Sequence, residues 1–191
     1  MMMRGWTAIE DRGYLALRGP DAVRFLNGQV TNKVEHALSG KTVPACVCSI
    51  KGKVEALVFI RALRSGDGLL IETEASQVEE VFNRLDRYLI ADDCELSVLE
   101  DPPRWKHVIG VHTDHGTECW RFGIQGFDVE DSAELEGDEI PGEKLRYLKL
   151  IHGIPESGFE ITGEEFPSEL GLDRWAVDFH KGCYLGQEVV S

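Results

Sequence analysis

The sequence contains no stretch that approaches the roughly 20 consecutive apolar residues that a bilayer-spanning helix needs. Residues 1–6 also lack the apolar segment and cleavage site of a secretory signal peptide. These two absences exclude a membrane-embedded class. They predict a cytoplasmic protein without a membrane partner.

Basic residues are scarce beside acidic ones. The chain has 20 Lys and Arg against 34 Asp and Glu, a formal net charge of −14. Non-specific nucleic-acid binding needs cations that displace phosphate counterions, and anionic membranes attract basic segments. The charge balance therefore argues against both partners, and a polyanionic ligand would need a local basic patch.

Cysteines are few and odd in number. They are Cys46, Cys48, Cys94, Cys119 and Cys183. An odd, widely spaced set without a signal peptide fits reduced thiols better than a disulfide framework. Cys46 and Cys48 lack the CxxC spacing of a structural zinc site and are expected to fill the core. His112, Asp114 and His115 carry metal-capable groups, but an expected hairpin loop holds them, so no metal site is predicted.

The periodicity predicts an α+β chain with antiparallel sheets and packed helices. Expected strands cover 14–18, 42–49, 54–60, 69–73, 94–99, 106–111 and 119–124. A short helix is expected with Pro20 at its first position and Asn27-Gly28 as its C-cap. Another helix begins at Pro141 and ends at Gly153.

The best-specified element is a helix that follows residue 75. Ser76 and Glu79 have the spacing of a capping box. The apolar residues that recur on one face are Val78, Val81, Phe82, Leu85 and Leu89. Arg84 and Arg87 fall off this stripe, so we expect them on a solvated face rather than at a ligand.

An acidic stretch separates the last predicted strand from the helix at Pro141. Residues 128–143 include eight acidic side chains and no basic one. Like charges at this density predict a solvated segment with little order, and we place the main domain seam here. The helix beyond carries Arg146 and Lys149, two cations that could anchor an anionic ligand.

Reactive chemistry concentrates in residues 179–188. Cys183 follows Lys181 by two positions and lies between Gly182 and Gly186. A nearby cation lowers the pKa of a thiol, and glycine lets a partner approach the backbone. Two interpretations stay open: an accessible, poised thiol, or a buried cysteine with Lys181 in solvent.

The segment from Lys181 to Glu188 reads Lys-Gly-Cys-Tyr-Leu-Gly-Gln-Glu. This motif resembles the signature of the YgfZ-type folate-binding proteins, which are relatives of the glycine cleavage T-protein (aminomethyltransferase). Segments 26–32, 51–53, 86–89 and 153–155 resemble the same family in the same order, so the likeness spans essentially the whole chain.

The resemblance implies one folate-binding, T-protein-like domain over residues 1–191, built from two related subdomains. We expect these subdomains at about 1–50 plus 140–191 and at about 51–139. A small β-barrel usually follows the signature in this family. The chain stops at Ser191, so that barrel is absent, and the chain is either truncated or an unusually short member.

The resemblance also implies a tetrahydrofolate-binding accessory protein that supports assembly or repair of iron–sulfur enzymes. Its partners would be folate and iron–sulfur enzymes or assembly proteins. Cys183, activated by Lys181, would act as thiolate nucleophile or transient metal–sulfur ligand. The expected folate-binding residues are Asn27, Gln29 and Thr31 at the pterin ring, Arg146 or Lys149 at the glutamate tail, and Gln187 and Glu188 beside the thiol in the same cavity.

A tetrahydrofolate-dependent aminomethyltransferase is the alternative. T-proteins carry an aspartate in the strand that matches residues 52–59, where this chain offers only Glu55 at a shifted position. They also carry a glutamate where this chain offers Ile124. A catalytic base must lie within hydrogen-bond reach of its substrate, so the accessory role is favoured and enzymatic activity stays open.

Overall fold

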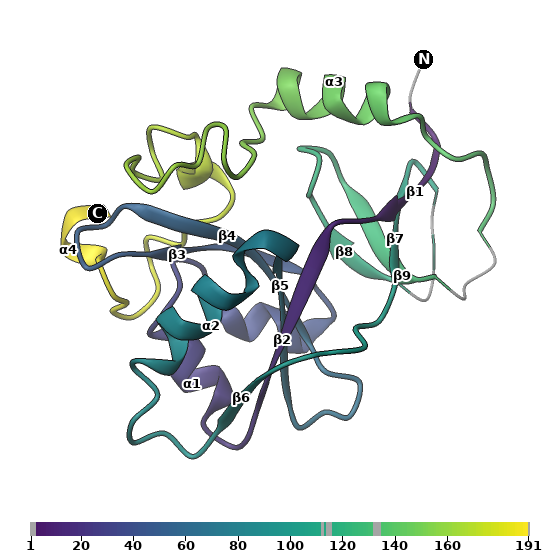
Figure 1. Cartoon of the computed structure of the whole chain (residues 1–191). Coiled ribbons are helices and arrows are strands. Elements are labelled where there is room, and N and C mark those ends of the chain that lie inside the picture. Colours follow the sequence, from purple (N-terminus) through teal and green to yellow (C-terminus); the bar gives the residue numbers. More distant parts are fainter. Residues whose placement is uncertain (1–2, 112, 114–115, 132–134, 191) are drawn as a thin grey trace.

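The computed structural model describes residues 3–111, 113, 116–131 and 135–190, and Figure 1 shows two antiparallel sheets. The four-stranded sheet has the order β1 (Gly5–Ile9), β7 (Trp105–Ile109), β9 (Gly126–Glu130), β8 (Thr117–Cys119). The five-stranded sheet has the order β3 (Val43–Cys48), β4 (Val54–Ala62), β5 (Gly68–Glu74), β2 (Arg12–Arg18), β6 (Glu95–Val98). The predicted α+β class with antiparallel sheets is confirmed.

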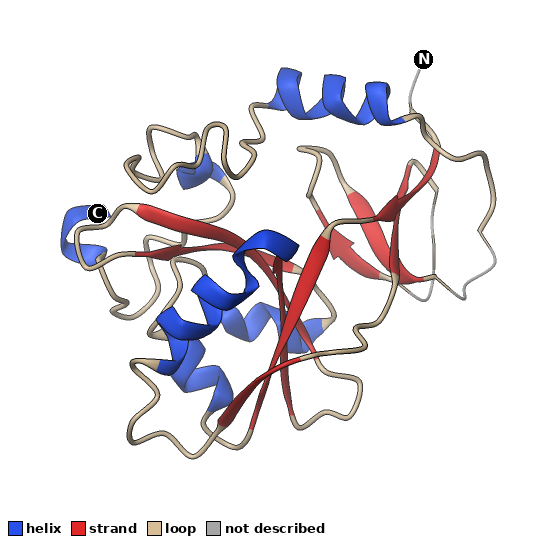
Figure 2. Cartoon of the chain, in the orientation of Figure 1, coloured by secondary structure: helices blue, strands red, loops and turns tan. Residues whose placement is uncertain are grey.

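Helices are short and lie outside the sheets. The α-helices are α1 (Ala22–Asn27), α2 (Val78–Asp86), α3 (Gly142–His152) and α4 (Gln187–Val190). The 3₁₀ helices are η1 (Val34–Ser39), η2 (Ala75–Gln77) and η3 (Leu172–Arg174). Figure 2 shows α1 and α2 against the five-stranded sheet, while α3 runs across the top of the molecule.

The main core lies between the five-stranded sheet and α1 and α2. Leu15 and Leu17 of β2 and Val58 and Ile60 of β4 are fully buried there. Alternate side chains of a strand share a face, so each strand contributes every second residue. On α2 the predicted apolar stripe is confirmed, with Leu85 fully buried. Burial of each such side chain contributes roughly 1.5–3 kcal/mol.

A second core covers the other face of the β3–β4 hairpin. Cys46 and Cys48 lie in it with Phe59 of β4 and with Ile161 and Leu172 from the C-terminal third. The expected core role of these two thiols is confirmed. Burial raises the pKa of Cys46 to about 12 and also raises the pKa of Cys48, which keeps both thiols protonated and unreactive.

Two helix starts differ from the prediction. Pro20 lies in a turn, and α1 begins only at Ala22 after the Asp21 N-cap. The Ser76 capping box is wrong, because Ser76 belongs to η2 and α2 begins at Val78 without a side-chain cap. The 3₁₀ helix η2 follows β5 directly and contains Ser76, the residue expected to cap the helix.

One strand prediction and one prediction of disorder near the acidic stretch are also wrong. The strand expected over 119–124 is instead β8, which ends at Cys119 and is followed by a turn closed by the Gly123 N–H on the Trp120 carbonyl at 2.9 Å. The expectation of little order fails at its start, because Asp128 is fully buried in β9. Residues 132–134 of that stretch lie outside the described part.

A buried charge cluster joins the two sheets. Its carboxylates are Glu72 of β5 and Asp128 of β9, and its cations are Arg61 of β4 and Arg121 of the turn after β8. Arg121 Nη1 lies 2.8 Å from Glu72 Oε1 and its Nη2 lies 2.6 Å from Asp128 Oδ2. Arg61 Nη2 lies 2.6 Å from Glu72 Oε2 and 3.0 Å from Asp128 Oδ2. Each arginine therefore bridges one carboxylate from each sheet.

Strands β3 and β4 share one sheet although the predicted subdomain boundary near residue 50 passes between them. The division into two related subdomains stays a prediction. None of the helices in the described ranges is long and apolar enough to cross a membrane.

Candidate functional site

The signature segment packs on the loop that follows α1. Lys181 Nζ donates hydrogen bonds to the Asn27 carbonyl at 2.5 Å and the Val30 carbonyl at 2.6 Å. The Leu185 N–H donates to the Gly28 carbonyl at 3.1 Å. Segments 26–32 and 181–188, both of which match the family, are therefore neighbours in space.

A third matching segment, the hairpin turn at residues 51–53, meets the same place through two glycines. Gly186 has a φ of +85°, and a Cβ added to it would lie 2.5 Å from the Ser49 carbonyl and 3.1 Å from Gly52 Cα. Only glycine adopts this backbone conformation without strain and also permits such a close approach. The three segments form one unit, which we call the signature cluster (residues 26–32, 49–53 and 181–188).

Cys183 is exposed on the surface of the signature cluster, which contradicts the interpretation of a buried cysteine. Lys181, two residues before it, and Tyr184, the residue after it, are both buried. Burial lowers the pKa of Lys181 to about 8, although Glu35 and Asp178 act in the opposite direction. The thiol is thus accessible, and the cation is enclosed.

The predicted pterin-binding residues use their polar groups in hydrogen bonds within the signature cluster and to the loops around it. Thr31 is fully buried, donates to the Ala176 carbonyl at 2.6 Å and accepts from the Cys46 N–H at 2.8 Å. The Asn27 amide oxygen accepts the Val34 N–H at the start of η1. Their polar groups support the backbone.

Gln29 joins an arginine whose placement corrects the sequence-based expectation. Arg84 was expected on a solvated face but is buried, and it donates to the Gln29 amide oxygen at 3.0 Å and to the Cys48 carbonyl at 2.9 Å. It also pairs with Glu55 at 3.3 Å and packs over the Tyr88 ring. Burial lowers the pKa of Arg84. The position of Arg84 off the apolar stripe of the helix predicted a solvent-exposed side chain, but β4 and the loop around residue 29 cover this part of α2.

A cavity of about 570 Å³ lies beneath α3, away from the signature cluster. Arg146 and Lys149 line it, as do Leu57 and Phe59 of β4. The lining residues include none of Asn27, Gln29, Thr31, Lys181, Cys183, Gln187 and Glu188. The structure therefore separates the predicted glutamate-tail residues from the predicted pterin and thiol residues, which were expected in one cavity.

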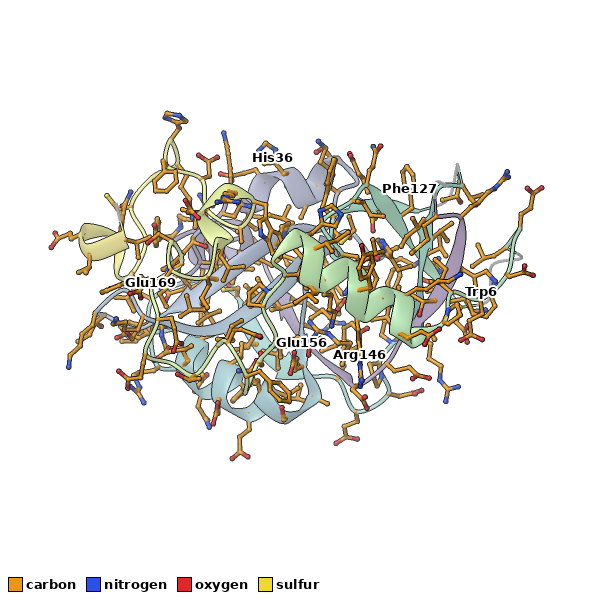
Figure 3. The ribbon with its side chains drawn as sticks, turned by 90° about the horizontal axis from the view of Figure 1, so that it is seen from above. Trp6, His36, Phe127, Arg146, Glu156 and Glu169 are labelled. Carbon is orange, nitrogen blue, oxygen red and sulfur yellow. The ribbon has the colours of Figure 1, made fainter. Side chains whose placement is uncertain are left out.

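The two α3 cations that line the cavity, Arg146 and Lys149, differ in availability. Lys149 Nζ lies 2.6 Å from Glu156 Oε1, so a carboxylate already neutralises it. Arg146 is exposed and has no ion-pair partner among the described side chains. Figure 3 shows Arg146 and Glu156 on the same side of α3. Arg146 is thus the free cation at the rim.

The cavity wall below α3 combines an aromatic ring with two guanidinium groups. Arg121 and Arg12 pack over the Phe59 ring at 4.5 and 5.7 Å from its centroid. Arg12 Nε also donates to Glu72 at 2.9 Å. Asp11 lines the cavity next to Arg12 and has a φ of +54°, an uncommon backbone conformation that is enriched at functional sites. No sequence pattern pointed to these residues, which stand out only as charges within or beside apolar strands.

His107, Cys119 and Asp128 form a buried group whose ligand atoms lie within 4.8 Å of one another. Asp128 already accepts hydrogen bonds from His107, Arg61 and Arg121, and two guanidinium groups would repel a metal cation. Burial raises the pKa of Cys119 and lowers that of His107. We assign this group to the junction between the sheets. His112, Asp114 and His115 lie outside the described residues.

Comparison with known sequences identifies relatives over nearly the whole chain. An iron–sulfur cluster assembly factor IBA57 homolog, mitochondrial, of Pyricularia oryzae is 29% identical in an alignment 206 positions long, which covers 97% of this chain and 52% of the relative. An uncharacterized protein of Haemophilus influenzae is 27% identical over 189 residues, covering 93% of this chain and 64% of the relative. No protein-family model matches the chain.

Among solved structures, the glycine cleavage system aminomethyltransferase T of Bartonella henselae has a TM-score of 0.75 at 16% identity. The match covers 99% of this chain and 62% of that one. The fold is therefore that of a T-protein-like protein. The T-protein-like fold and the curated relatives together support the resemblance to YgfZ-type proteins that the signature predicted. The chain spans about half the length of the IBA57 homologs that it matches.

Proposed function

We propose that this chain binds tetrahydrofolate in the cavity beneath α3 and serves as an accessory protein in iron–sulfur enzyme assembly or repair. The cavity itself supports the first part of the proposal, the binding of tetrahydrofolate. Its volume of about 570 Å³ is in the range of small-molecule sites. Its lining offers apolar walls, an aromatic ring and a few polar groups, which suits a ligand with a flat heterocycle and a carboxylate tail.

Arg146 is the residue best suited to the glutamate tail. A free guanidinium can bind a carboxylate with two parallel hydrogen bonds, whereas Lys149 would first have to leave Glu156. The pterin ring would lie against Phe59, with Asp11 and Arg12 as acceptor and donor for its edge. Asn27, Gln29 and Thr31 are not proposed as ligand contacts, because their polar groups hold the signature cluster together.

Cys183 supplies the second half of the proposal. An exposed thiol on a fixed loop is accessible to a partner protein, and thiolates are preferred ligands of iron–sulfur clusters. The relatives whose names describe iron–sulfur cluster assembly factors support this assignment. A cluster or its iron would be cargo that Cys183 meets at the surface, apart from the folate cavity.

The aminomethyltransferase alternative is disfavoured by β4. The β4 side chains that line the cavity are Leu57 and Phe59, and neither can take up a proton. Glu55 is paired with Arg84 outside the cavity. Transfer of a methylene group from an aminomethylated carrier protein to tetrahydrofolate, measured with the purified chain, would reverse this preference.

Complementation of a strain that lacks its own relative tests the accessory role. The wild-type chain should restore the activity of iron–sulfur enzymes, and Cys183→Ala should fail to do so. Cys94→Ala, which removes a partly buried thiol elsewhere, is the matched control and should complement. Full complementation by Cys183→Ala would refute the thiol role. We also propose a cytoplasmic location; the names of the IBA57 homologs state that those proteins are mitochondrial.

A further inference from the structure

Lys181 is enclosed by backbone oxygens. Its side chain reaches the carbonyls of Asn27 and Val30 at 2.5 and 2.6 Å, and the residue is only 9% exposed. An ammonium group has three N–H donors and no acceptor, so these two carbonyls use most of its hydrogen-bonding capacity.

The position of these carbonyls explains why a cation is needed. Asn27 is the last residue of α1, and the last carbonyls of a helix have no partner within the helix, while Val30 lies three residues beyond in the loop that follows α1. Buried carbonyls without a partner are costly. Lys181 reaches them from more than 150 residues further along the chain, so its bonds tie the signature segment to the end of α1.

A second attachment follows immediately after Cys183. The Tyr184 ring is buried, and its centroid lies 5.0 Å from Lys181 Nζ. The Leu185 N–H then donates to the Gly28 carbonyl at 3.1 Å. Cys183 is therefore exposed between two attached points, and both points are anchored at the same end of α1.

We propose that Lys181 is a positioning residue, whose bonds to the end of α1 hold the loop that presents the Cys183 thiol to a partner. It fixes where the thiol lies and does not activate it. This inference rests on the proposed role of Cys183 and replaces the sequence-based expectation that Lys181 lowers the pKa of that thiol.

Two measurements on the purified chain test this role without any partner. Hydrogen exchange reports the Leu185 amide, and the rate of Cys183 alkylation by iodoacetamide against pH reports the thiol. The variants are Lys181→Met, which keeps length and removes the ammonium, and Lys181→Gln, which keeps one donor and serves if the first variant does not fold. Lys33→Met, at an exposed lysine of the neighbouring loop, is the control.

We expect Lys181→Met to accelerate exchange of the Leu185 amide about ten-fold or more, with a smaller acceleration in Lys181→Gln and none in Lys33→Met. The pH midpoint of Cys183 alkylation should stay the same in all variants. In complementation, Lys181→Arg should rescue better than Lys181→Met, because it keeps a cationic donor. Unchanged Leu185 exchange would overturn the proposal, as would an alkylation midpoint raised by one pH unit. Loss of the thiol role itself would show separately, as complementation by Cys183→Ala.

Discussion

Replacing Asp128 by Asn removes one of the two negative charges that hold the sheets together. The Asp128 carboxylate is fully buried and accepts hydrogen bonds from His107 Nδ1 at 2.7 Å, Arg61 at 3.0 Å, and Arg121 at 2.6 and 3.1 Å. Asparagine has nearly the same shape, so the substitution changes charge and hydrogen bonding while leaving the packing volume almost intact. Glu72 alone would then balance the charges of Arg61 and Arg121, although it also pairs with Arg12.

The expected loss of stability is large for a single substitution. Breaking a buried ion pair by removing one partner costs about 3–5 kcal/mol, because it leaves an uncompensated buried charge. Small domains have unfolding free energies of roughly 5–15 kcal/mol. The Asp128→Asn chain should therefore be close to the limit of folding at 37 °C.

Urea unfolding followed by tryptophan fluorescence measures this loss, since the chain contains four tryptophans. We expect a lower midpoint with an unchanged slope, which indicates a stability effect without a change of folded-state compactness. Glu164→Gln, at an exposed carboxylate, is the control and should shift the free energy by less than about 0.5 kcal/mol. A loss below about 1 kcal/mol in Asp128→Asn would refute the reasoning that the cluster joins the sheets.

Three further predictions concern pH and backbone strain. Burial opposes ionisation of Glu72, but Arg121, Arg61 and Arg12 outweigh it and lower the pKa of Glu72 to about 2. The contribution of Glu72 to folding stability should therefore be complete above about pH 4.5 and be lost as the pH falls towards 2. Acid titration should show this loss in the wild type and a less steep one in Glu72→Gln. Burial lowers the pKa of Lys181 from 10.5 to about 8. The free energy of unfolding of the wild type relative to Lys181→Met, measured with urea, should therefore rise between pH 8 and 10.5. A fall over this range would contradict the lowered pKa. Gly186→Ala should cost roughly 1–3 kcal/mol in the same assay, because φ is +85° and a Cβ would meet the Ser49 carbonyl; a neutral effect would contradict the close approach.

The sequence was most informative where the signal is local, although the local capping-box signal at Ser76 was wrong. Apolar periodicity located α2 and the β4 strand, and Gly153 marked the end of α3, where it adopts the left-handed conformation. Each of these features depends on residues within a few positions of one another.

Charged side chains were placed wrongly when their partners are distant in the chain. Asp128 looked solvated because its acidic neighbours are close in sequence, whereas Arg61 lies 67 positions away. Arg84 looked solvated because it falls off the apolar stripe of its helix, and its partner Gln29 is 55 positions away. The carbonyls that enclose Lys181 are backbone groups, which no side-chain pattern can indicate.

Within the candidate site, the sequence identified the signature segment and the cations of α3 but assigned them to one cavity. Cys183 and Arg146 belong to different surfaces because the chain between them, from α3 to η3, passes along the β3–β4 hairpin before it reaches the end of α1. Which side chains share a cavity depends on such tertiary paths.

Calorimetric titration with tetrahydrofolate tests folate binding beneath α3 most directly. We predict saturable binding to the wild-type chain, weakened about ten-fold or more in Arg146→Met and unchanged in Lys144→Met, a neighbouring exposed lysine of α3 that does not line the cavity. Gln29→Ala should also bind normally, because Gln29 lies in the signature cluster. Absence of binding at millimolar ligand, or binding that Gln29→Ala weakens and Arg146→Met does not, would contradict the proposed site.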